Sequence, residues 1–332
     1  MSSSPAFKLP TVADVVAARA RIKDHAVVTP LVESPLLNER LGGRLFAKAE
    51  VLQRTGSFKF RGAYNRLAEL SPDERRRGVI TYSSGNYAQG IAAAAKLLGI
   101  PAVILMPADA PRIKLDNTRA HGAEVLPYDR HTESREAMGE RIGRERGLVL
   151  VKPYDEIAVV AGQGTAGLEL IEQAKARGAK LDAVLAPCGG GGLVAGCAIA
   201  VAAESPGTEM FAVEPEGFDD TRRSLEKGSP VPNVPGAQSF CDALLMGIPG
   251  DLTFAVNSKL VTRGIAVSDD AVRTAMVVAF NEFKLVVEPS GSVALAAILS
   301  GAVPIRNRTV AVVLSGGNVD PGTFRDALAR AG

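Results

Sequence analysis

The sequence predicts an α/β protein in which a parallel β-sheet carries helices on both faces. Along the 332 residues, short runs rich in β-branched residues alternate with Ala-rich stretches of helical length. Parallel neighbours need a crossover connection, usually a right-handed one through a helix, so this strand–helix–strand alternation favours a parallel sheet. Glycines also stand where several helices should end, at Gly99, Gly122 and Gly147, as left-handed C-caps do.

The first series of elements lies between about residues 77 and 154. Its expected elements are strand 78–83, helix 86–99, strand 102–107, helix 112–122, strand 124–129, helix 132–147 with an N-cap near Thr132, and strand 148–153. Each strand runs through a short turn into a helix. We expect this segment to form a compact subdomain inserted into a larger body.

A second series begins near Gly162 and runs to the last strand. Its expected elements are a helix from about 162 to 178, strand 183–188, helix 192–203, strand 210–215, an irregular Gly- and Pro-rich stretch from about 216 to 251, helices 269–285 and 292–300, and strand 309–315. The two series together predict one three-layer α/β body with a smaller α/β unit inserted at 77–154.

Composition excludes several classes of protein. Hydrophobic residues make up 46% and charged residues 22%, which argues against general disorder. The formal net charge of +2 gives no basic footprint for nucleic acid and no polybasic membrane anchor. The start of the chain lacks the apolar stretch of a signal peptide, and the most apolar segment, 91–107, is interrupted by Lys96, Gly99 and Pro101. We therefore expect no nucleic-acid partner and no membrane association.

Histidine and cysteine are scarce. The chain has three of each, and Cys188, Cys197 and Cys241 have no metal-like spacing, so a reduced, cytoplasmic compartment is expected. Three histidines argue against a multi-His zinc site and against most Ser-His-Asp schemes. Any chemistry should rest on another residue type.

A lysine between two phenylalanines is the first candidate. Lys59 stands between Phe58 and Phe60 in a stretch of otherwise mostly small residues. Desolvation lowers the pKa of a lysine, and a neutral amine can attack a carbonyl or remove a proton. A lysine with a buried stem and a solvated head is an equally good interpretation of this segment alone.

Four consecutive glycines, Gly189–Gly192, are the second candidate. They follow an apolar strand and precede a helix, so their N–H groups can point at one place beside the helix N-terminus. This pattern favours phosphate binding over a flexible surface turn, because the loop joins strand and helix tightly.

Two further turns follow expected strands. Ser83, Ser84 and Asn86 precede a helix and suit a carboxylate, although a plain helix N-cap explains them equally well. The turn 315–318, which begins with Ser315, follows the last strand and is either a ligand loop or a simple strand end. The segment 162–167 fits the spacing G-x-G-x-x-G, but no acidic residue closes the next strand, so we interpret it as a tightly packed helix start.

Taken together, these segments resemble the fold-type II pyridoxal-phosphate enzymes, specifically the threonine/serine dehydratase and serine racemase family. SFKFRGA is similar to the cofactor-lysine motif, SSGNYAQG to the asparagine loop and GGGGLVAG to the phosphate loop, and VEPSGSVALAA and LSGGNVD to two C-terminal signatures. The resemblance runs nearly end to end. It implies a large cofactor-binding domain, residues 1–76 and 155–332, and a small mobile domain, residues 77–154, that closes over substrate.

The resemblance implies a pyridoxal 5′-phosphate cofactor and a role for each matching residue. Lys59 would bind the cofactor aldehyde with Phe58 beside it, and Gly189, Gly190, Gly191 and Gly192 would bind the phosphate. Asn86 would contact the 3′-oxygen, and Ser315 would face the pyridine nitrogen. A neutral hydroxyl at that nitrogen suits elimination better than transamination.

The implied reaction is dehydration of a β-hydroxy-α-amino acid, of the threonine or serine type and including hydroxyaspartate or phenylserine, to a 2-oxo acid and ammonia. Lys59 would remove the α-proton, and Ser83, Ser84, Asn86 and Tyr87 would bind the substrate. Ser84 matches the second acid/base of racemases, so an amino acid racemase acting on serine or aspartate is the alternative.

Arg135 matches a position that reaches the distal carboxylate of a dicarboxylic ligand. A surface arginine in an i,i+4 pair is the other interpretation. The resemblance also implies a divalent cation such as Mg²⁺ or Ca²⁺, bound by Glu214, Asp220 and the carbonyl of Phe218, although a loop of solvated charges would look the same.

The sequence departs from the family at two places. Tyr87 stands where the family nearly always has histidine, and Cys241-Asp242-Ala243 replaces an Ala-Asp-Gly pattern, so the substrate stays open. A homodimer is expected from the resemblance. Two further functions remain as alternatives: a nicotinamide dehydrogenase built on 162–167, and a cofactor-binding protein without activity.

Overall fold

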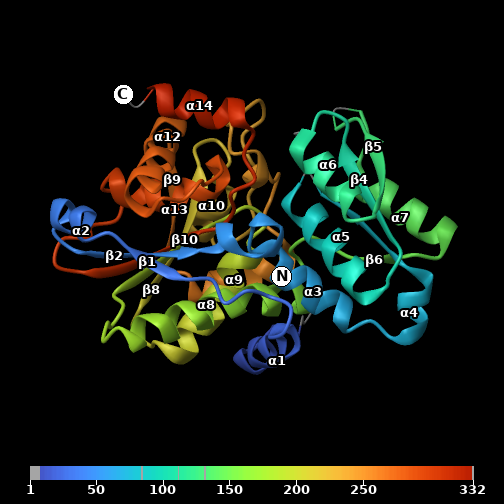
Figure 1. Ribbon diagram of the computed structural model, residues 1–332, viewed down its shortest axis with the longest axis horizontal. Helices are drawn as coiled ribbons and strands as arrows, with labels where there is room; N and C mark the ends of the chain where they lie inside the picture. Colours follow the sequence, from blue (N-terminus) through green and yellow to red (C-terminus); the bar gives the residue numbers. More distant parts are fainter. Residues whose placement is uncertain (1–7, 84, 111, 131, 331–332) are drawn as a thin grey trace.

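The computed structural model describes residues 8–83, 85–110, 112–130 and 132–330. They form a large body around a six-stranded sheet and a small body around a four-stranded sheet, which lie side by side (Figure 1). The predicted alternation of parallel strands and helices is confirmed. Within the described ranges, no helix is both long and apolar enough to cross a membrane.

The six-stranded sheet has the order β1-β2-β10-β7-β8-β9, and only β1 runs antiparallel to its neighbour. Its strands are β1 (Leu31–Glu33), β2 (Arg44–Ala49), β7 (Ala183–Pro187), β8 (Glu209–Pro215), β9 (Arg263–Val267) and β10 (Thr309–Leu314). The four-stranded sheet, all parallel, has the order β5-β4-β3-β6. Its strands are β3 (Val79–Tyr82), β4 (Ala102–Pro107), β5 (Glu124–Tyr128) and β6 (Val149–Leu150).

Helices cover both faces of each sheet (Figure 1). The helices of the small body are α5 (Asn86–Leu98), α6 (Arg112–Ala120) and α7 (Arg135–Arg146). The other helices are α1 (Val12–Ile22), α2 (Pro35–Leu41), α3 (Lys59–Ala68), α4 (Pro72–Arg77), α8 (Ile157–Ala176), α9 (Gly192–Glu204), α10 (Asp220–Lys227), α11 (Asp251–Leu260), α12 (Asp269–Val278), α13 (Pro289–Leu299) and α14 (Pro321–Arg330).

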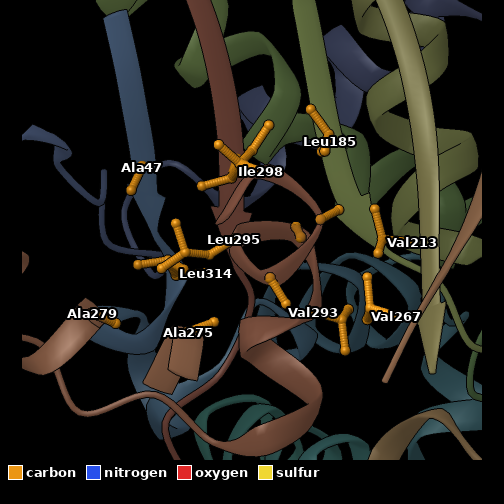
Figure 2. Close-up of a cluster of buried hydrophobic side chains, with 14 of the residues drawn as sticks. Ala47, Leu185, Val213, Val267, Ala275, Ala279, Val293, Leu295, Ile298 and Leu314 are labelled. Atoms are coloured by element: carbon orange, nitrogen blue, oxygen red, sulfur yellow. The ribbon is translucent and has the colours of Figure 1, made fainter. Parts of the chain in front are cut away.

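Alternation along the central strands places successive side chains in two different cores. Leu185 of β7 packs with α12 and α13 on one face of the large sheet, together with Val293 and Ile298 of α13 (Figure 2). Val184 and Ala186 of the same strand pack with α1, α8 and α9 on the other face. Strands buried on both faces in this way read as continuous apolar runs, which is why the sequence pattern located them.

Helix α3 lies between the two bodies, because it packs against α5 of the small body and α8 of the large one. Glycines permit the close approach of these helices. A Cβ on Gly162 would lie 2.6 Å from the Cα of Gly62, and one on Gly167 would lie 3.0 Å from the Cα of Cys197 in α9. The segment 162–167 is thus tightly packed as expected, but it lies inside α8, which begins at Ile157, five residues earlier than Gly162.

The stretch 216–251 is less irregular than its composition suggests. It contains α10, and the predicted elements also omit α11 and β9 that follow it. Helix α7 begins at Arg135 with Ser134 as its N-cap, so the N-cap expected near Thr132 is wrong by two residues. The C-cap glycines Gly99 and Gly147 do adopt left-handed conformations, at φ of 66° and 68°.

Candidate active site

One cavity lies where the carboxyl ends of strands from both sheets meet. It holds about 750 Å³ of space not filled by atoms, its open mouth included. Residues that follow β3, β7 and β10 line it, as expected for α/β folds. The sequence-predicted residues that line this cavity are Phe58, Lys59, Ser83, Asn86, Tyr87, Arg135, Gly189, Gly190, Gly191, Gly192 and Ser315. Ser84 lies outside the described residues.

Lys59 is the first residue of α3, and its side chain faces the cavity. The Nζ atom lies 3.4 Å from the carbonyl oxygen of Pro153, 5.1 Å from the ring centre of Phe58 and 5.6 Å from that of Tyr87. Burial lowers the pKa of this amine to about 8, against the opposing negative charge of Glu288. At neutral pH a larger fraction of this amine is therefore neutral than for an ordinary lysine.

Helix α11 holds the glycine loop through two hydrogen bonds. The Thr253 hydroxyl donates to the carbonyl of Gly190 at 2.7 Å, and the Asn257 amide donates to that of Gly191 at 3.4 Å. Gly191 has a φ of 88°, and a Cβ there would lie 2.9 Å from both the Thr253 Oγ and the Asn257 Nδ2. A Cβ on Gly190 would overlap the ring of Tyr154. The loop therefore excludes side chains at these two positions.

This loop leads directly into α9, which begins at Gly192. The first N–H groups of a helix have no partner within the helix, and they carry the positive end of its dipole. An anion such as a phosphate is stabilised at such a place. The loop and the start of α9 thus suit an anion, and phosphate binding by Gly189–Gly192 stays a prediction.

Asn86 begins α5 and is held on both sides of its amide. Its Nδ2 donates to the carboxylate of Glu288, and its Oδ1 accepts from the Nδ2 of Asn318 at 2.9 Å. The same Asn318 group also donates to the carbonyl of Thr55 at 2.9 Å. Since three chain segments fix this amide, Asn86 presents one defined orientation to the cavity.

Tyr87 and Ser315 also line the cavity. Tyr87 is 1% exposed, and within the described part of the chain its buried hydroxyl has no hydrogen-bond partner. Burial raises the pKa of that phenol well above its usual value. Ser315 is 5% exposed, and its carbonyl accepts from the N–H of Phe58 at 3.0 Å, which ties the end of β10 to the turn before Lys59.

Arg135 lies at the rim of the cavity, in the first turn of α7. Its guanidinium lies 5.4 Å from the ring centre of Tyr82 and pairs with Glu136 at 2.7 Å. One of its Nη atoms is 3.8 Å from the Met246 sulfur. The interpretation of Arg135 as part of an i,i+4 surface pair is wrong, since its ion-pair partner is the adjacent Glu136.

Ten lining residues were not assigned a role from the sequence. Those with a polar or sulfur-bearing side chain are Tyr82, Tyr154, Met246, Glu288 and Ser290, and the others are Pro153, Pro187, Leu193, Ala243 and Leu244. Glu288 carried the best signal, because a carboxylate stands between an apolar run and Pro289 within a recognised motif. Tyr154 follows β6, the position at which α/β folds place ligands, but aromatic residues are common at strand ends, so the pattern alone is weak.

The residues expected to bind a cation lie together beside α10. Both carboxylate oxygens of Glu214 accept backbone N–H groups, from Thr221 at 2.9 Å and from Arg222 at 2.8 Å. Asp220 accepts from the Asn233 amide at 2.8 Å, while its second oxygen is buried with no partner in the described structure. No cluster of three or more His, Cys, Asp or Glu side chains that could hold a metal occurs among the described residues.

Comparison with known proteins identifies the family. A model described as "Pyridoxal-phosphate dependent enzyme" matches residues 22–316. The chain belongs to this family. The predicted fold type and the dependence on pyridoxal phosphate are therefore confirmed, and the nicotinamide alternative built on 162–167 is wrong because that segment is helix interior.

The relatives include both lyases and racemases. An L-threo-3-hydroxyaspartate ammonia-lyase from Saccharomyces cerevisiae is 42% identical over 312 residues, which cover 94% of each chain. A serine racemase from Schizosaccharomyces pombe is 40% identical over 312 residues, covering 94% of this chain and 95% of the relative. Among solved structures, the serine racemase of maize superimposes with a TM-score of 0.90 at 36% identity, covering 97% of this chain and 98% of that one. Both the dehydratase expectation and its racemase alternative fit this set.

The residues of the cavity fit pyridoxal phosphate. The cofactor needs an amine for its aldehyde and donors for its phosphate, and Lys59 and the loop Gly189–Gly192 line the same cavity. The lowered pKa of Lys59 and the lack of space for side chains at Gly190 and Gly191 support this fit independently of the relatives.

Proposed function

We propose that this protein is a pyridoxal-phosphate-dependent dehydratase that converts a β-hydroxy-α-amino acid to a 2-oxo acid and ammonia. The observation that carries the proposal is the pairing of Lys59, a buried amine with a pKa of about 8, with the glycine cradle in one cavity. The bound cofactor supplies the electron sink that makes the α-proton of an amino acid removable. The chain supplies the groups that bind the substrate and move that proton.

Lys59 has two roles in this proposal. Its amine would hold the cofactor aldehyde, and the same amine, when free, would remove the α-proton of the substrate. A low pKa serves both roles, since each needs the neutral amine. Ser315 would offer the cofactor ring a neutral hydroxyl in place of a carboxylate, which would favour loss of the β-hydroxyl over transamination.

The loop after β3 binds the α-carboxylate of the substrate. Ser83 lies at the carboxyl end of β3, and Asn86 begins α5, so N–H groups at the start of that helix are available to an anion. Asn86 would also hold the cofactor in this proposal, with its amide oriented by Glu288 and Asn318. Tyr87 adds a buried phenolic hydroxyl that has no partner in the described structure and so is free to meet a substrate oxygen.

We infer that the preferred substrate is a dicarboxylic amino acid, L-threo-3-hydroxyaspartate. Arg135 carries a positive charge at the rim of the cavity, where a second carboxylate of the substrate would lie. A bidentate arginine–carboxylate contact gives both affinity and orientation. The ammonia-lyase activity named for the Saccharomyces cerevisiae relative supports this choice.

Racemisation is the second candidate function. Ser84 would return the proton to the opposite face of the substrate from Lys59, and the Schizosaccharomyces pombe relative is named a serine racemase. The two functions differ in product. Each enantiomer of serine, threonine, 3-hydroxyaspartate and phenylserine is incubated with the protein, and the dehydratase should release a 2-oxo acid and ammonia from L-threo-3-hydroxyaspartate. Formation of the opposite enantiomer without any 2-oxo acid would establish the racemase and overturn the dehydratase.

The cofactor assignment has its own test. The purified, cofactor-loaded protein should be yellow, with a visible absorption band that borohydride removes. Lys59→Ala should lose that band and the activity together, while the same substitution at the exposed Lys96 should change neither. A wild type that stays colourless with added cofactor would refute the proposal, and a yellow protein with no activity would be a cofactor-binding protein without catalysis.

Residues 77–154 form the mobile domain in this proposal, and they close over the substrate. The cavity supports this assignment, because residues of both bodies line it. Pro153 and Tyr154, which also line it, lie in the connection that returns from the small body to the large one. Closure would exclude water from the reacting groups.

A divalent cation such as Mg²⁺ belongs to the proposal as a structural ion bound by Glu214, Asp220 and the Phe218 carbonyl. The buried, unpartnered oxygen of Asp220 supports it. Thermal unfolding in Mg²⁺ and in a chelator should differ by several degrees. Identical unfolding temperatures would remove the ion from the proposal.

The protein is further proposed to be a cytoplasmic homodimer. Val27, Val28 and Leu52 are 43%, 67% and 50% exposed, and the Gln53 side chain bonds both backbone groups of Val27, which holds the two segments of this apolar patch together. Such a patch suits contact with a second copy. Three buried cysteines, all free, suit a reduced compartment. Light scattering should give twice the chain mass, and Val28→Asp should halve it.

A further inference from the structure

A buried lysine joins the two bodies beside the cavity. Lys114 lies in α6 of the small body and its side chain is 2% exposed. Its Nζ atom is 2.6 Å from the Oδ2 of Asp242 and 3.5 Å from the Oε2 of Glu288. Both carboxylates belong to the large body, in the short helix Asp242–Leu244 and just before α13. The two carboxylates outweigh the effect of burial and raise the pKa of Lys114, so this cation stays charged.

The stem of Lys114 also supports the substrate loop. A Cβ on Gly85 would overlap the Cδ of Lys114 and lie 3.1 Å from its Cε. The stem of Lys114 therefore leaves no space for a side chain at Gly85. The loop that carries Ser83 and Asn86 therefore rests directly on the lysine side chain.

Glu288 connects this lysine to the cavity. Its carboxylate accepts from the amide of Asn86 and faces the Nζ of Lys114 with its other oxygen. Burial raises the pKa of Glu288, and the charge of Lys114 opposes that rise. Without Lys114, the buried carboxylate of Glu288 would lose a positive charge that stabilises it, and its contact with Asn86 would weaken.

We propose that Lys114 is a positioning residue that clamps the small body onto the large one through Asp242 and Glu288, and thereby sets the Ser83–Asn86 loop and the Asn86 amide. Separation of the two bodies breaks these contacts and returns three charges to water. The clamp thus exists only in the closed arrangement, and it couples closure to the shape of the substrate loop. This inference rests on the closing movement included in the proposed function.

The test compares Lys114→Met, which keeps most of the side-chain volume, with Lys114→Arg, Asp242→Asn and the double variant Lys114→Met/Asp242→Asn. Lys96→Met is the matched control, because Lys96 is an exposed lysine in the same body. Amide hydrogen exchange of the cofactor-loaded protein is measured on peptides covering 83–90, 112–120 and 193–201. Steady-state kinetics with L-threo-3-hydroxyaspartate are measured in parallel.

Lys114→Met should speed exchange at 83–90 and 112–120 about tenfold or more, leave 193–201 unchanged, and raise KM by a larger factor than it lowers kcat. Asp242→Asn should give part of the same effect, and the double variant should be no worse than Lys114→Met, because the two residues act through one contact. Lys114→Arg should recover most of the protection. Unchanged exchange at 83–90, or additive effects in the double variant, would overturn the clamp.

The exchange experiment needs no turnover, so it is separate from the proposed activity. A protein that binds the cofactor, shows the expected exchange and makes no 2-oxo acid would refute the dehydratase and leave the clamp standing. Should Lys114→Met fail to fold, Asp242→Asn decides the question, since the Asp242 side chain is 33% exposed and its carboxylate is replaced by an amide of the same shape.

Discussion

Substitution of Gly191 by alanine is the most direct test of the phosphate cradle. Gly191 has a φ of 88°, and the added Cβ would lie 2.9 Å from the Thr253 Oγ and the Asn257 Nδ2. These are the groups that hold the loop by donating to the carbonyls of Gly190 and Gly191. The methyl group therefore acts twice, by straining the backbone and by pushing the loop away from α11.

The two effects have different sizes and different consequences. A left-handed conformation costs an L-residue about 1–2 kcal/mol, which lowers overall stability. Crowding in a packed site costs about 1–3 kcal/mol. The crowding displaces the donors of the cradle, and if it falls wholly on cofactor binding it weakens affinity about 5- to 150-fold, since 1.4 kcal/mol is a factor of ten.

Gly207→Ala is the matched control, because Gly207 has a φ of 89° and nothing within 4 Å of its added Cβ. Both variants are titrated with pyridoxal phosphate and followed by visible absorbance, and their unfolding in urea is measured without cofactor. Gly207→Ala should lose stability and keep wild-type affinity, whereas Gly191→Ala should lose both. Wild-type affinity in Gly191→Ala would refute the assignment of this loop to the phosphate.

Four further predictions concern ionisable residues. Arg135→Ala should raise KM for L-threo-3-hydroxyaspartate about 10- to 150-fold, because a hydrogen bond to a charged group contributes roughly 1.5–3 kcal/mol, and it should leave KM for L-serine unchanged; equal effects on both substrates would remove Arg135 from substrate selection. In the cofactor-free protein, the rate of amine acetylation at Lys59 should rise with a midpoint near pH 8, measured by peptide mass spectrometry; a midpoint near the ordinary 10.5 would contradict its burial. Arg61→Met should reduce the free energy of unfolding by about 3–5 kcal/mol, because it leaves Glu50 and Glu169 as buried charges, and the urea midpoint measures it. Burial would raise the pKa of Glu50, but the charge of Arg61 outweighs burial and the pKa is lowered. The stabilisation from this pair is therefore present above about pH 4.5 and is lost as the pH falls below it. A wild-type free energy of unfolding that does not change with pH in this range would refute the sign.

The sequence located those parts of the site that depend on local patterns. Gly189–Gly192, Ser315 and Ser83 each follow a recognisable strand, and the carboxyl ends of parallel strands meet at one edge of a sheet. Lys59 was identified by its apolar neighbours, and its pKa is lowered by burial as that context predicts. Local patterns were therefore enough to gather Lys59, the glycine loop and the two turns at strand ends, although the two strand sets lie in different sheets, whereas Arg135 was found through the family resemblance.

The sequence could not identify contacts between distant segments. Lys114 and Glu288 are far apart along the chain, and nothing near either residue indicates that they meet. Helix α10 was missed for another reason: it is short and strongly polar, and the Gly- and Pro-rich residues around it conceal its start and end. In α8, the residues from Ile157 to Ala161 were not recognised as helical because an apolar run of this length is compatible with a strand as well as with a helix.

The placement of Lys59 depends on charges outside the cavity. Arg61, two residues further along α3, is fully buried and pairs with Glu50 at 2.8 Å and with Glu169 of α8 at 2.7 Å. Lys48 of β2 reaches the same Glu169 at 2.7 Å, so the start of α3 is fixed to the large sheet and to α8 by four buried charges. A buried network of this kind adds little net stability but admits one arrangement, since a shifted helix would leave charges unpaired. The amine of Lys59 is thereby held in one place on the large body while the Lys114 contacts set the substrate loop on the small one, and the reaction requires both to face the same cavity.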